Sequence, residues 1–331
     1  MRAAYAGATV LRVMPDILII KTSSLGDVIH HMPAAADARR HFPGARIAWV
    51  VEEAFAPLVR LHPAVNEVIP VAARRWRGLN LLTFSTWREA FAFKRLVRAR
   101  PSSVVIDTQG LVKSALMACS AKGARHGYDR KSIKEPAASI LYNVRHSVSR
   151  DLHAIERNRR LTALALGYSF DANLDYGLDR AKLTAPSAKP YAVFVHATAQ
   201  AKKRWPEERW IETGRALHSR GLEIVLPWGS DDERAAAECI AASVPGARVP
   251  DRAPLDAMAR LIAGASLVIG VDTGLLHLAA ALGVPLVAIF VASEPGLTGP
   301  MGSGPIEIAG AKDEPPFVAQ VTTAIEKVTR A

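Results

Sequence analysis

Short apolar runs that alternate with helical segments constrain this chain more than any other feature. In the first half, the runs have the length and composition of buried strands and cover residues 16–20 (DILII), 46–51 (RIAWVV), 65–71 and 103–107 (SVVID). We expect one helix from the end of the loop 21–27 to about His41, and another over residues 86–100. Buried strands that alternate with helices predict a parallel sheet covered on both faces.

The same alternation begins again after residues 184–190 (TAPSAKP), a Pro- and Ala-rich segment that is typical of a linker. Strands are predicted at 191–196, 222–227, 266–271 and 285–291, and helices at 206–220, 255–263, 274–282 and 316–329. The fold class is therefore α/β, with two doubly wound, Rossmann-like domains that face a central cleft. We expect domains over residues 1–185 and 186–315, and a C-terminal helix over 316–331 that packs back on the first domain.

Charge is unevenly distributed along the chain. The net charge is +11, and residues 1–185 contain 28 Lys and Arg against 15 Asp and Glu, whereas the remainder contains 14 against 16. Such asymmetry indicates that the first half meets an anionic partner: nucleic acid, a phosphorylated substrate or an acidic membrane surface. A basic face that is merely solvated is the alternative.

The sequence lacks the signatures of several classes of protein. Only Cys119 and Cys239 are present, so we expect no disulfide framework and a reducing cytoplasm. The first 15 residues have no signal-peptide core, and the longest apolar stretch, 275–292, contains His277 and Pro285, which predicts a helix, a turn and a strand instead of a membrane span. Neither G-x-G-x-x-G nor G-x-x-x-x-G-K-[ST] occurs, and no metal-ligand spacing is evident, so we expect no cofactor and no metal.

The loop 21–27 (KTSSLGD) follows the first predicted strand and leads into a helix. Asp27 lies at or inside the first helical turn, where an acidic side chain is favoured by the helix dipole. The functional alternative is a carboxylate at the cleft that removes a proton from a hydroxyl.

Two further loops follow predicted strands of the second half. Residues 202–204 (KKR), after Thr198, offer cations that suit a diphosphate, although an ordinary basic loop before a Pro-started helix has the same composition. Asp272 ends a strand and a helix begins at about Gly274, so free N–H groups there can hold a phosphate. By itself, His277 is better explained as a packed core histidine.

A basic and aromatic segment runs from residue 74 (RRWR) to Arg100. It includes Phe84, Trp87, Phe91 and Phe93 among several cations, with Glu89 as its only acid. Aromatic anchors beside cations suit an anionic membrane surface. The alternative, which we favour slightly for Trp87 and Phe91, is a plain amphipathic helix packed on the core.

Taken together, these stretches resemble the ADP-heptose:lipopolysaccharide heptosyltransferases of glycosyltransferase family 9. The similarity extends over nearly the whole chain from residue 16 and rests on KTSSLGDVIHHMPA (21–34), WVVEEAF (49–55), VIPVAARRWR (68–77), VIDTQGLVKSAL (105–116), KEPAAS (134–139), KRWPEERW (203–210), LPWG (226–229) and VDTGLLHLAAAL (271–282). The RRWR run and the K-x-W-P motif favour the branch that adds the first heptose.

The resemblance implies an inverting enzyme of the GT-B type that moves heptose from ADP-heptose to the first Kdo sugar of Kdo2-lipid A. It implies that Asp27 is the catalytic base and that Lys203 binds and neutralises the diphosphate. The remaining site residues that it implies are Ser24, Gly26, Arg74, Arg75 and Arg77 for the acceptor, and Thr198, Glu233, Asp272, Thr273, Gly274 and His277 for the donor.

The family resemblance also implies a cytoplasmic enzyme that is peripheral on the inner membrane. Three alternatives remain open at this stage. The nearest is a transferase of the same family that adds a later heptose. A two-domain small-molecule binding protein joins two doubly wound halves in a similar way. Nucleic-acid binding has the least support, because no known binding motif accompanies the basic charge.

Overall fold

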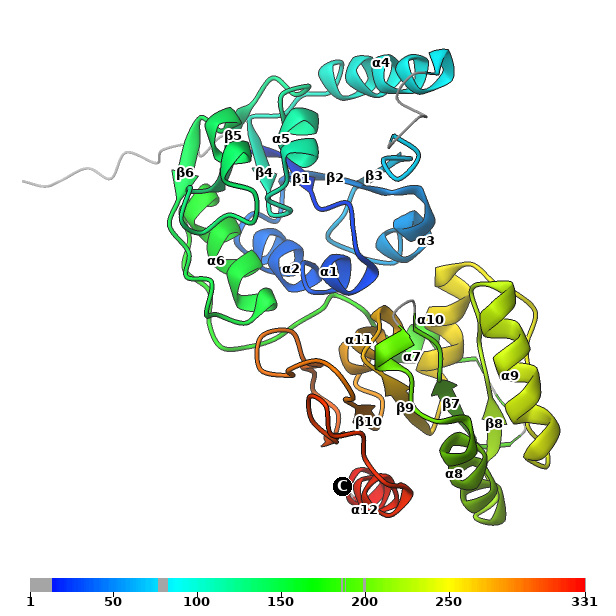
Figure 1. Ribbon diagram of the computed structural model, residues 1–331. Coiled ribbons are helices and arrows are strands. Elements are labelled where there is room, and N and C mark those ends of the chain that lie inside the picture. The colour runs from blue at the N-terminus through cyan, green and yellow to red at the C-terminus, as the bar shows by residue number, and fades with distance from the viewer. Residues whose placement is uncertain (1–13, 77–82, 186, 188, 199–200, 331) are drawn as a thin grey trace, which may run out of the picture.

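Two α/β domains follow each other along the chain, each built round a parallel sheet (Figure 1). The computed structural model describes residues 14–76, 83–185, 187, 189–198 and 201–330. The first sheet has the order β3-β2-β1-β4-β5-β6, with strands β1 (Asp16–Ile20), β2 (Arg46–Glu52), β3 (Glu67–Val71), β4 (Val104–Asp107), β5 (Ala124–Tyr128) and β6 (Val144–His146). The second has the order β11-β10-β9-β7-β8, with β7 (Tyr191–Val195), β8 (Glu223–Val225), β9 (Leu267–Val271), β10 (Leu286–Ile289) and β11 (Ile306–Ala309).

Helices cover both faces of each sheet. Those of the first part of the chain are α1 (Leu25–Ile29), α2 (Met32–His41), α3 (Ala56–Val59), α4 (Phe84–Arg98), α5 (Val112–Ala118) and α6 (Ala154–Leu166). Those of the second are α7 (Arg180–Leu183), α8 (Glu207–Ser219), α9 (Asp231–Ser243), α10 (Leu255–Ala263), α11 (Gly274–Ala281) and α12 (Val318–Arg330). Along β1, Ile17 and Ile19 enter one core cluster while Leu18 and Ile20 enter another, because successive side chains of a strand point to opposite faces. The predicted α/β class is confirmed.

The helix expected up to His41 is divided. α1 ends at Ile29 and α2 begins at Met32, with Pro33 in its first turn. Proline has no backbone N–H, and its ring crowds the carbonyl four residues earlier, which is that of Ile29. The prediction of one continuous helix was wrong for this reason, and the break leaves α1 as a short helix that faces the second domain.

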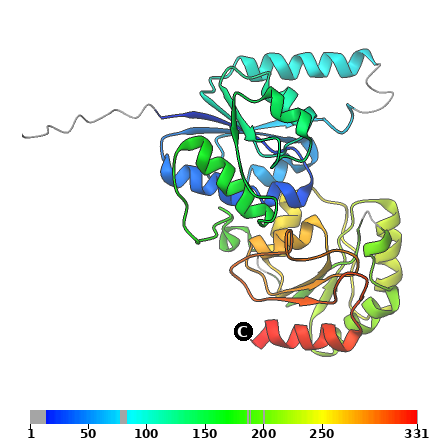
Figure 2. The same ribbon diagram turned by 60° about the vertical axis from the view of Figure 1, so that its left-hand side comes forward.

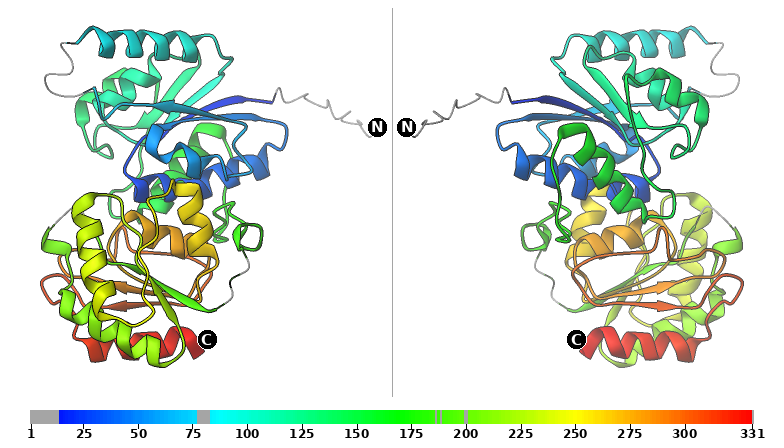
Figure 3. Two further views of the ribbon diagram at one scale, coloured as in Figure 1. Left: turned by 90° about the vertical axis from the view of Figure 1, so that its right-hand side faces the viewer. Right: turned by 90° about the vertical axis from the view of Figure 1, so that its left-hand side faces the viewer.

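The C-terminal helix differs from the expectation that it packs back on the first domain. Helix α12 lies against β10, β11 and α8, and its apolar stripe of Val321, Ala324, Ile325 and Val328 enters the core of the second domain. The face of the second sheet beside β11 needs this cover, because strands of a parallel sheet are apolar on both sides. The terminal helix, red in Figure 3, lies at the edge of the molecule farthest from the first domain.

The linker region also differs in detail from the expectation. Helix α7 precedes the expected boundary at residue 185, yet it packs on α10 of the second domain. The Arg180 guanidinium donates hydrogen bonds to the carbonyl oxygens of Ala263, Ala265 and Gly283. The chain therefore crosses to the second domain before residue 180.

The two domains touch through a close contact between α1 and α11 (Figure 2). A Cβ atom on Gly274 would lie 2.6 Å from Cβ of Leu25, and one on Gly26 would lie 3.0 Å from Cδ2 of His277. Neither helix could come so near the other with a larger residue at these positions. A second contact joins α3 to α10.

Candidate active site

A cleft of about 920 Å³ lies between the domains and is lined by both of them. The first domain contributes Ser24, Leu25, Glu53, Phe55 and Arg74, and the second contributes Thr198, Lys203, Trp228, Glu233, Arg252, Met258, Asp272, Thr273 and Gly274. These segments follow the carboxyl ends of strands in both sheets, which is where ligands bind in doubly wound folds.

Asp27 lies in the first turn of α1, and its side chain is 44% exposed. The backbone N–H and the hydroxyl of Ser24 donate to its Oδ2 at 2.8 and 2.9 Å, while its Oδ1 lies 3.7 Å from Nζ of Lys21. Desolvation acts to raise the pKa of Asp27, but the Lys21 cation and the Ser24 hydrogen bonds outweigh it, so the pKa lies below its ordinary value. Asp27 can therefore cap the helix and, at the same time, be an ionised carboxylate beside the cleft.

The loop that carries Asp27 is held by residues far away in the sequence. Oε1 of Gln109 accepts hydrogen bonds from the N–H groups of Thr22 and Ser23 at 3.0 and 3.1 Å. The buried Lys21 ammonium donates to the carbonyl oxygen of Thr108 at 3.1 Å, and burial lowers the pKa of this lysine. Gln109 and Lys21 were not among the predicted site residues. Both lie inside stretches that carry the family resemblance, which was the only available signal.

On the other side of the cleft, Lys203 and Asp272 form an ion pair. Nζ of Lys203 lies 2.5 Å from Oδ2 of Asp272, and the Ser293 hydroxyl donates to the same oxygen at 2.7 Å. Burial acts to raise the pKa of Asp272, but hydrogen bonding from His277, Lys203 and Ser293 lowers it well below the usual carboxyl range. Asp272 is thus an anion that holds the Lys203 ammonium at the cleft. Ser293 was not predicted.

The other predicted donor residues lie round this pair. Thr273 and Gly274 begin α11, so its unpaired N–H groups line the cleft beside Asp272. Thr198 is buried at the cleft wall. The Glu233 carboxylate lines the cleft too, and its Oε2 accepts the N–H of Gly229 at 2.7 Å.

His277 lies behind Asp272 and belongs to a cluster of histidines between the domains. Its Nε2 is 3.8 Å from Oδ1 of Asp272, and its Nδ1 is 3.2 Å from Nε2 of His30. The ring of His153 lies 5.5 Å from that of His30. Desolvation, followed by the neighbouring histidines, lowers the pKa of His30 well below its ordinary value, which favours a neutral ring. His30 was missed because it has no motif of its own.

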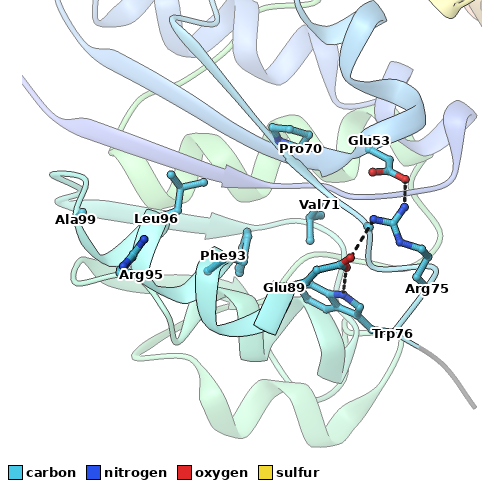
Figure 4. A pocket seen from close by; sticks show the side chains of 12 residues that line it. Glu53, Pro70, Val71, Arg75, Trp76, Glu89, Phe93, Arg95, Leu96 and Ala99 are labelled. Atoms are coloured by element: carbon cyan, nitrogen blue, oxygen red, sulfur yellow. Dashed lines mark hydrogen bonds and ion pairs between the residues drawn. The ribbon is translucent and has the colours of Figure 1, made fainter. Parts of the chain in front are cut away.

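The predicted acceptor residues are less concentrated. Ser24 and Arg74 line the cleft, whereas Gly26 faces His277 within the helix contact. Arg75 lies in an adjoining groove, where it pairs with Glu53 and Glu89 (Figure 4). Arg77 lies outside the described residues.

This arrangement suits transfer of an anionic leaving group. The Asp27 carboxylate lies beside the first-domain wall, next to Ser24 and Leu25. The opposite wall holds a cation and a helix N-terminus, which can stabilise a departing diphosphate. Within the described parts of the chain, no group of three or more His, Cys, Asp or Glu side chains could hold a metal ion. Over the same residues, no helix has the length and apolar character needed to cross a bilayer.

Comparisons with known proteins agree with this geometry. The family model described as glycosyltransferase family 9 (heptosyltransferase) matches residues 90–323. The chain belongs to glycosyltransferase family 9. Among its relatives, the lipopolysaccharide heptosyltransferase 1 of Pseudomonas aeruginosa is 46% identical over 88% of this chain and 83% of that protein. The Escherichia coli protein of the same name is 43% identical over 86% of this chain and 91% of that protein.

Solved family 9 structures share the fold. The Escherichia coli heptosyltransferase WaaC with ADP superposes with a TM-score of 0.88 at 40% identity, over 94% of this chain and 99% of that one. Escherichia coli heptosyltransferase II superposes with a TM-score of 0.73 at 20% identity, over 94% and 98%. The predicted GT-B architecture, in which two Rossmann-like domains face a cleft, is confirmed, and the chain is a family 9 glycosyltransferase.

Proposed function

We propose that this protein transfers L-glycero-D-manno-heptose from ADP-heptose to the first Kdo of Kdo2-lipid A, at the cytoplasmic face of the inner membrane. Relatives named lipopolysaccharide heptosyltransferase 1 support this acceptor, since several are 43–46% identical over most of the chain. Relatives named lipopolysaccharide heptosyltransferase 2 or 3 are less similar. An Escherichia coli heptosyltransferase 2 is 34% identical over only 104 residues, and an Escherichia coli heptosyltransferase 3 is 24% identical over 288 residues.

The observation that carries the proposal is the opposition of two charged groups across one cleft. Asp27 lies in the first turn of α1, beside the first-domain wall residues Ser24 and Leu25, whereas Lys203 and Asp272 line the second-domain wall beside the start of α11. A displacement reaction needs a proton acceptor near the attacking hydroxyl and positive charge near the leaving group.

ADP-heptose suits the second-domain wall. Its diphosphate would meet the Lys203 ammonium and the N–H groups at the start of α11. Trp228, Pro254 and Met258 supply an apolar stretch of the same wall, which suits the adenine ring. Solved complexes of Escherichia coli WaaC with ADP and with ADP-2-deoxy-2-fluoro heptose support this class of donor.

The acceptor suits the basic first domain, because Kdo carries a carboxylate and lipid A carries phosphates. In the proposed reaction, a Kdo hydroxyl gives its proton to Asp27 while its oxygen bonds to the anomeric carbon of heptose. The bond from that carbon to the phosphate oxygen breaks, and its electron pair leaves with ADP. Attack from the face opposite ADP inverts the anomeric configuration. Lys203 stabilises the negative charge that grows on the diphosphate.

Product analysis tests the proposal. Purified protein is incubated with ADP-heptose and either Kdo2-lipid A or the same lipid that already carries one heptose, and the masses of the products are measured by mass spectrometry. The expected result is addition of a single heptose to Kdo2-lipid A. Transfer only to the heptosylated acceptor would instead assign a later step of core synthesis.

Replacement of the base provides a second test. Asp27→Asn keeps an oxygen for the Ser24 hydrogen bonds but cannot take up a proton, so turnover should fall by roughly 10²–10⁴ while donor affinity stays within a few-fold. The matched control is Asp151→Asn, which removes the same charge from an exposed site in the first domain. Near wild-type turnover of Asp27→Asn would exclude Asp27 as the base.

A further inference from the structure

Helix α4 presents a face of unusual composition to the solvent. It attaches to the domain through Thr86, Phe93 and Val97, which are its buried residues. At 3.6 residues per turn, seven other positions fall in one sector of roughly 120°. These are three aromatic residues and four cations, all exposed: Phe84, Trp87, Phe91, Arg88, Lys94, Arg95 and Arg98. Glu89, the only acid of the helix, lies outside this sector.

The structure contradicts the expectation that Trp87 and Phe91 pack on the core, since they are 55% and 64% exposed. They border a groove of about 390 Å³ between α4 and α5, lined mainly by apolar side chains. Leu116 of α5 is exposed on the other side of this groove and extends the apolar surface. An apolar patch of this kind on a soluble domain marks an interaction site.

The charge on this face identifies its partner. Aromatic rings surrounded by cations suit the boundary between anionic head groups and acyl chains, where the rings enter the boundary and the cations meet phosphates. We infer that the outward face of α4, with Leu116, docks on an anionic phospholipid leaflet. The inference deepens the proposed function, on which it rests for the identity of the lipid acceptor.

The position of α4 is compatible with delivery of a lipid head group to the cleft. Helix α4 lies at the end of the first domain that is farthest from the second domain (Figure 1). Between α4 and the cleft lies the groove of Figure 4, which contains Arg75 paired with Glu53 and Glu89. Glu53 lines this groove and the cleft alike, and Trp76 lines this groove and the one beside α5. A continuous surface therefore joins the docking face to the site of transfer.

Vesicle binding tests the docking face. The variant Trp87→Ser with Phe91→Ser is compared with Leu164→Ser with Ile140→Ser, whose side chains are 53% and 76% exposed elsewhere on the first domain. Co-sedimentation uses vesicles of phosphatidylglycerol and phosphatidylcholine, and vesicles of phosphatidylcholine alone. We expect the wild type and the control to bind the anionic vesicles, and the α4 variant to bind them at least about ten-fold more weakly.

Activity separates docking from catalysis. With acceptor embedded in anionic vesicles, the α4 variant should lose turnover in parallel with its binding. With a de-acylated, water-soluble acceptor, its kcat and KM should match the wild type. Equal vesicle binding by the α4 variant and the wild type, an equal loss in the control pair, or equal wild-type binding to neutral vesicles would overturn the inference. Failure of the wild type on the soluble acceptor would instead refute the proposed function and leave the vesicle result intact.

Discussion

Two neighbouring lysines allow the role of the Lys203–Asp272 pair to be isolated. Lys203 is largely enclosed at the cleft wall, with its ammonium 2.5 Å from Asp272, whereas Lys202 beside it is exposed. Lys203→Ala and Lys202→Ala therefore remove the same charge one residue apart. Only the first removes a cation that the structure aims at the proposed diphosphate site.

The expected loss follows from the contacts. A hydrogen bond to a charged group contributes about 1.5–3 kcal/mol, which corresponds to roughly 10- to 150-fold in Kd. Removal of Lys203 also leaves Asp272 facing the diphosphate without its cation, and this repulsion favours the upper half of that range. Turnover should fall further, because the negative charge on the leaving group grows during bond cleavage. An exposed cation is screened within about 8 Å at physiological ionic strength, so Lys202→Ala should change Kd less than about two-fold.

Calorimetric titration of ADP into each variant, at one fixed ionic strength, measures these values, and steady-state assays give kcat. Thermal denaturation of both variants verifies that they are folded. An ADP affinity of Lys203→Ala within two-fold of the wild type would refute the assigned contact. An equal loss of ADP affinity in both lysine variants would show that the effect comes from general electrostatics and not from a specific contact of Lys203.

Three further predictions concern the first domain and its contact with the second. Because Lys21 helps to lower the pKa of Asp27, Lys21→Gln should raise that pKa and shift the acid limb of the kcat/KM profile to higher pH. If the acid limb stays at the same pH, it does not report the ionisation of Asp27. Arg74→Gln should raise the acceptor KM about ten-fold with unchanged ADP affinity, and a rise in the Kd of ADP instead would assign Arg74 to the donor. Gly274→Ala should destabilise the protein by about 1–3 kcal/mol in urea unfolding, since its Cβ would meet Cβ of Leu25. Leu25→Gly removes that atom, so the double variant should lose less stability than the sum of the two single losses, and a plain sum would contradict this steric cause.

The central strands could be predicted from the sequence because both of their faces are buried. β1, β7 and β9 are continuous apolar runs, and their predicted bounds agree closely with the structure. Short strands with polar residues carry no such signal. The edge strands β6 (VRH) and β11 (IEIA) and the interior strand β5 (ARHGY) contain polar or partly exposed residues, and none of the three was predicted, whereas the more apolar edge strands β3 and β8 were. The packing of α12 could not be predicted either, because an amphipathic helix specifies an apolar face without specifying its partner.

Some parts of the site could be predicted from the sequence and others could not. Asp27, Lys203 and Asp272 follow strand ends, so strand prediction placed their loops at the cleft, but the family resemblance was needed to choose Asp27 as the base and Lys203 from its basic loop. Their partners come from elsewhere: Gln109 is 87 residues from Thr22, and Ser293 is 21 residues from Asp272. Such contacts depend on the order of strands within each sheet, and apolar periodicity does not determine that order.

The glycine contact between α1 and α11 has a mechanical consequence. Two helices in direct backbone proximity can rotate about their point of contact, but they cannot approach further, so the contact is a fulcrum. Points near a fulcrum move least, and both Asp27, in the first turn of α1, and Thr273, the N-cap of α11, lie close to it. Opening of the cleft would therefore separate α3 from α10 at the far side, while the base and the phosphate-binding turn keep nearly the same spacing. Donor entry and product release would then depend on the side of the cleft where α3 meets α10.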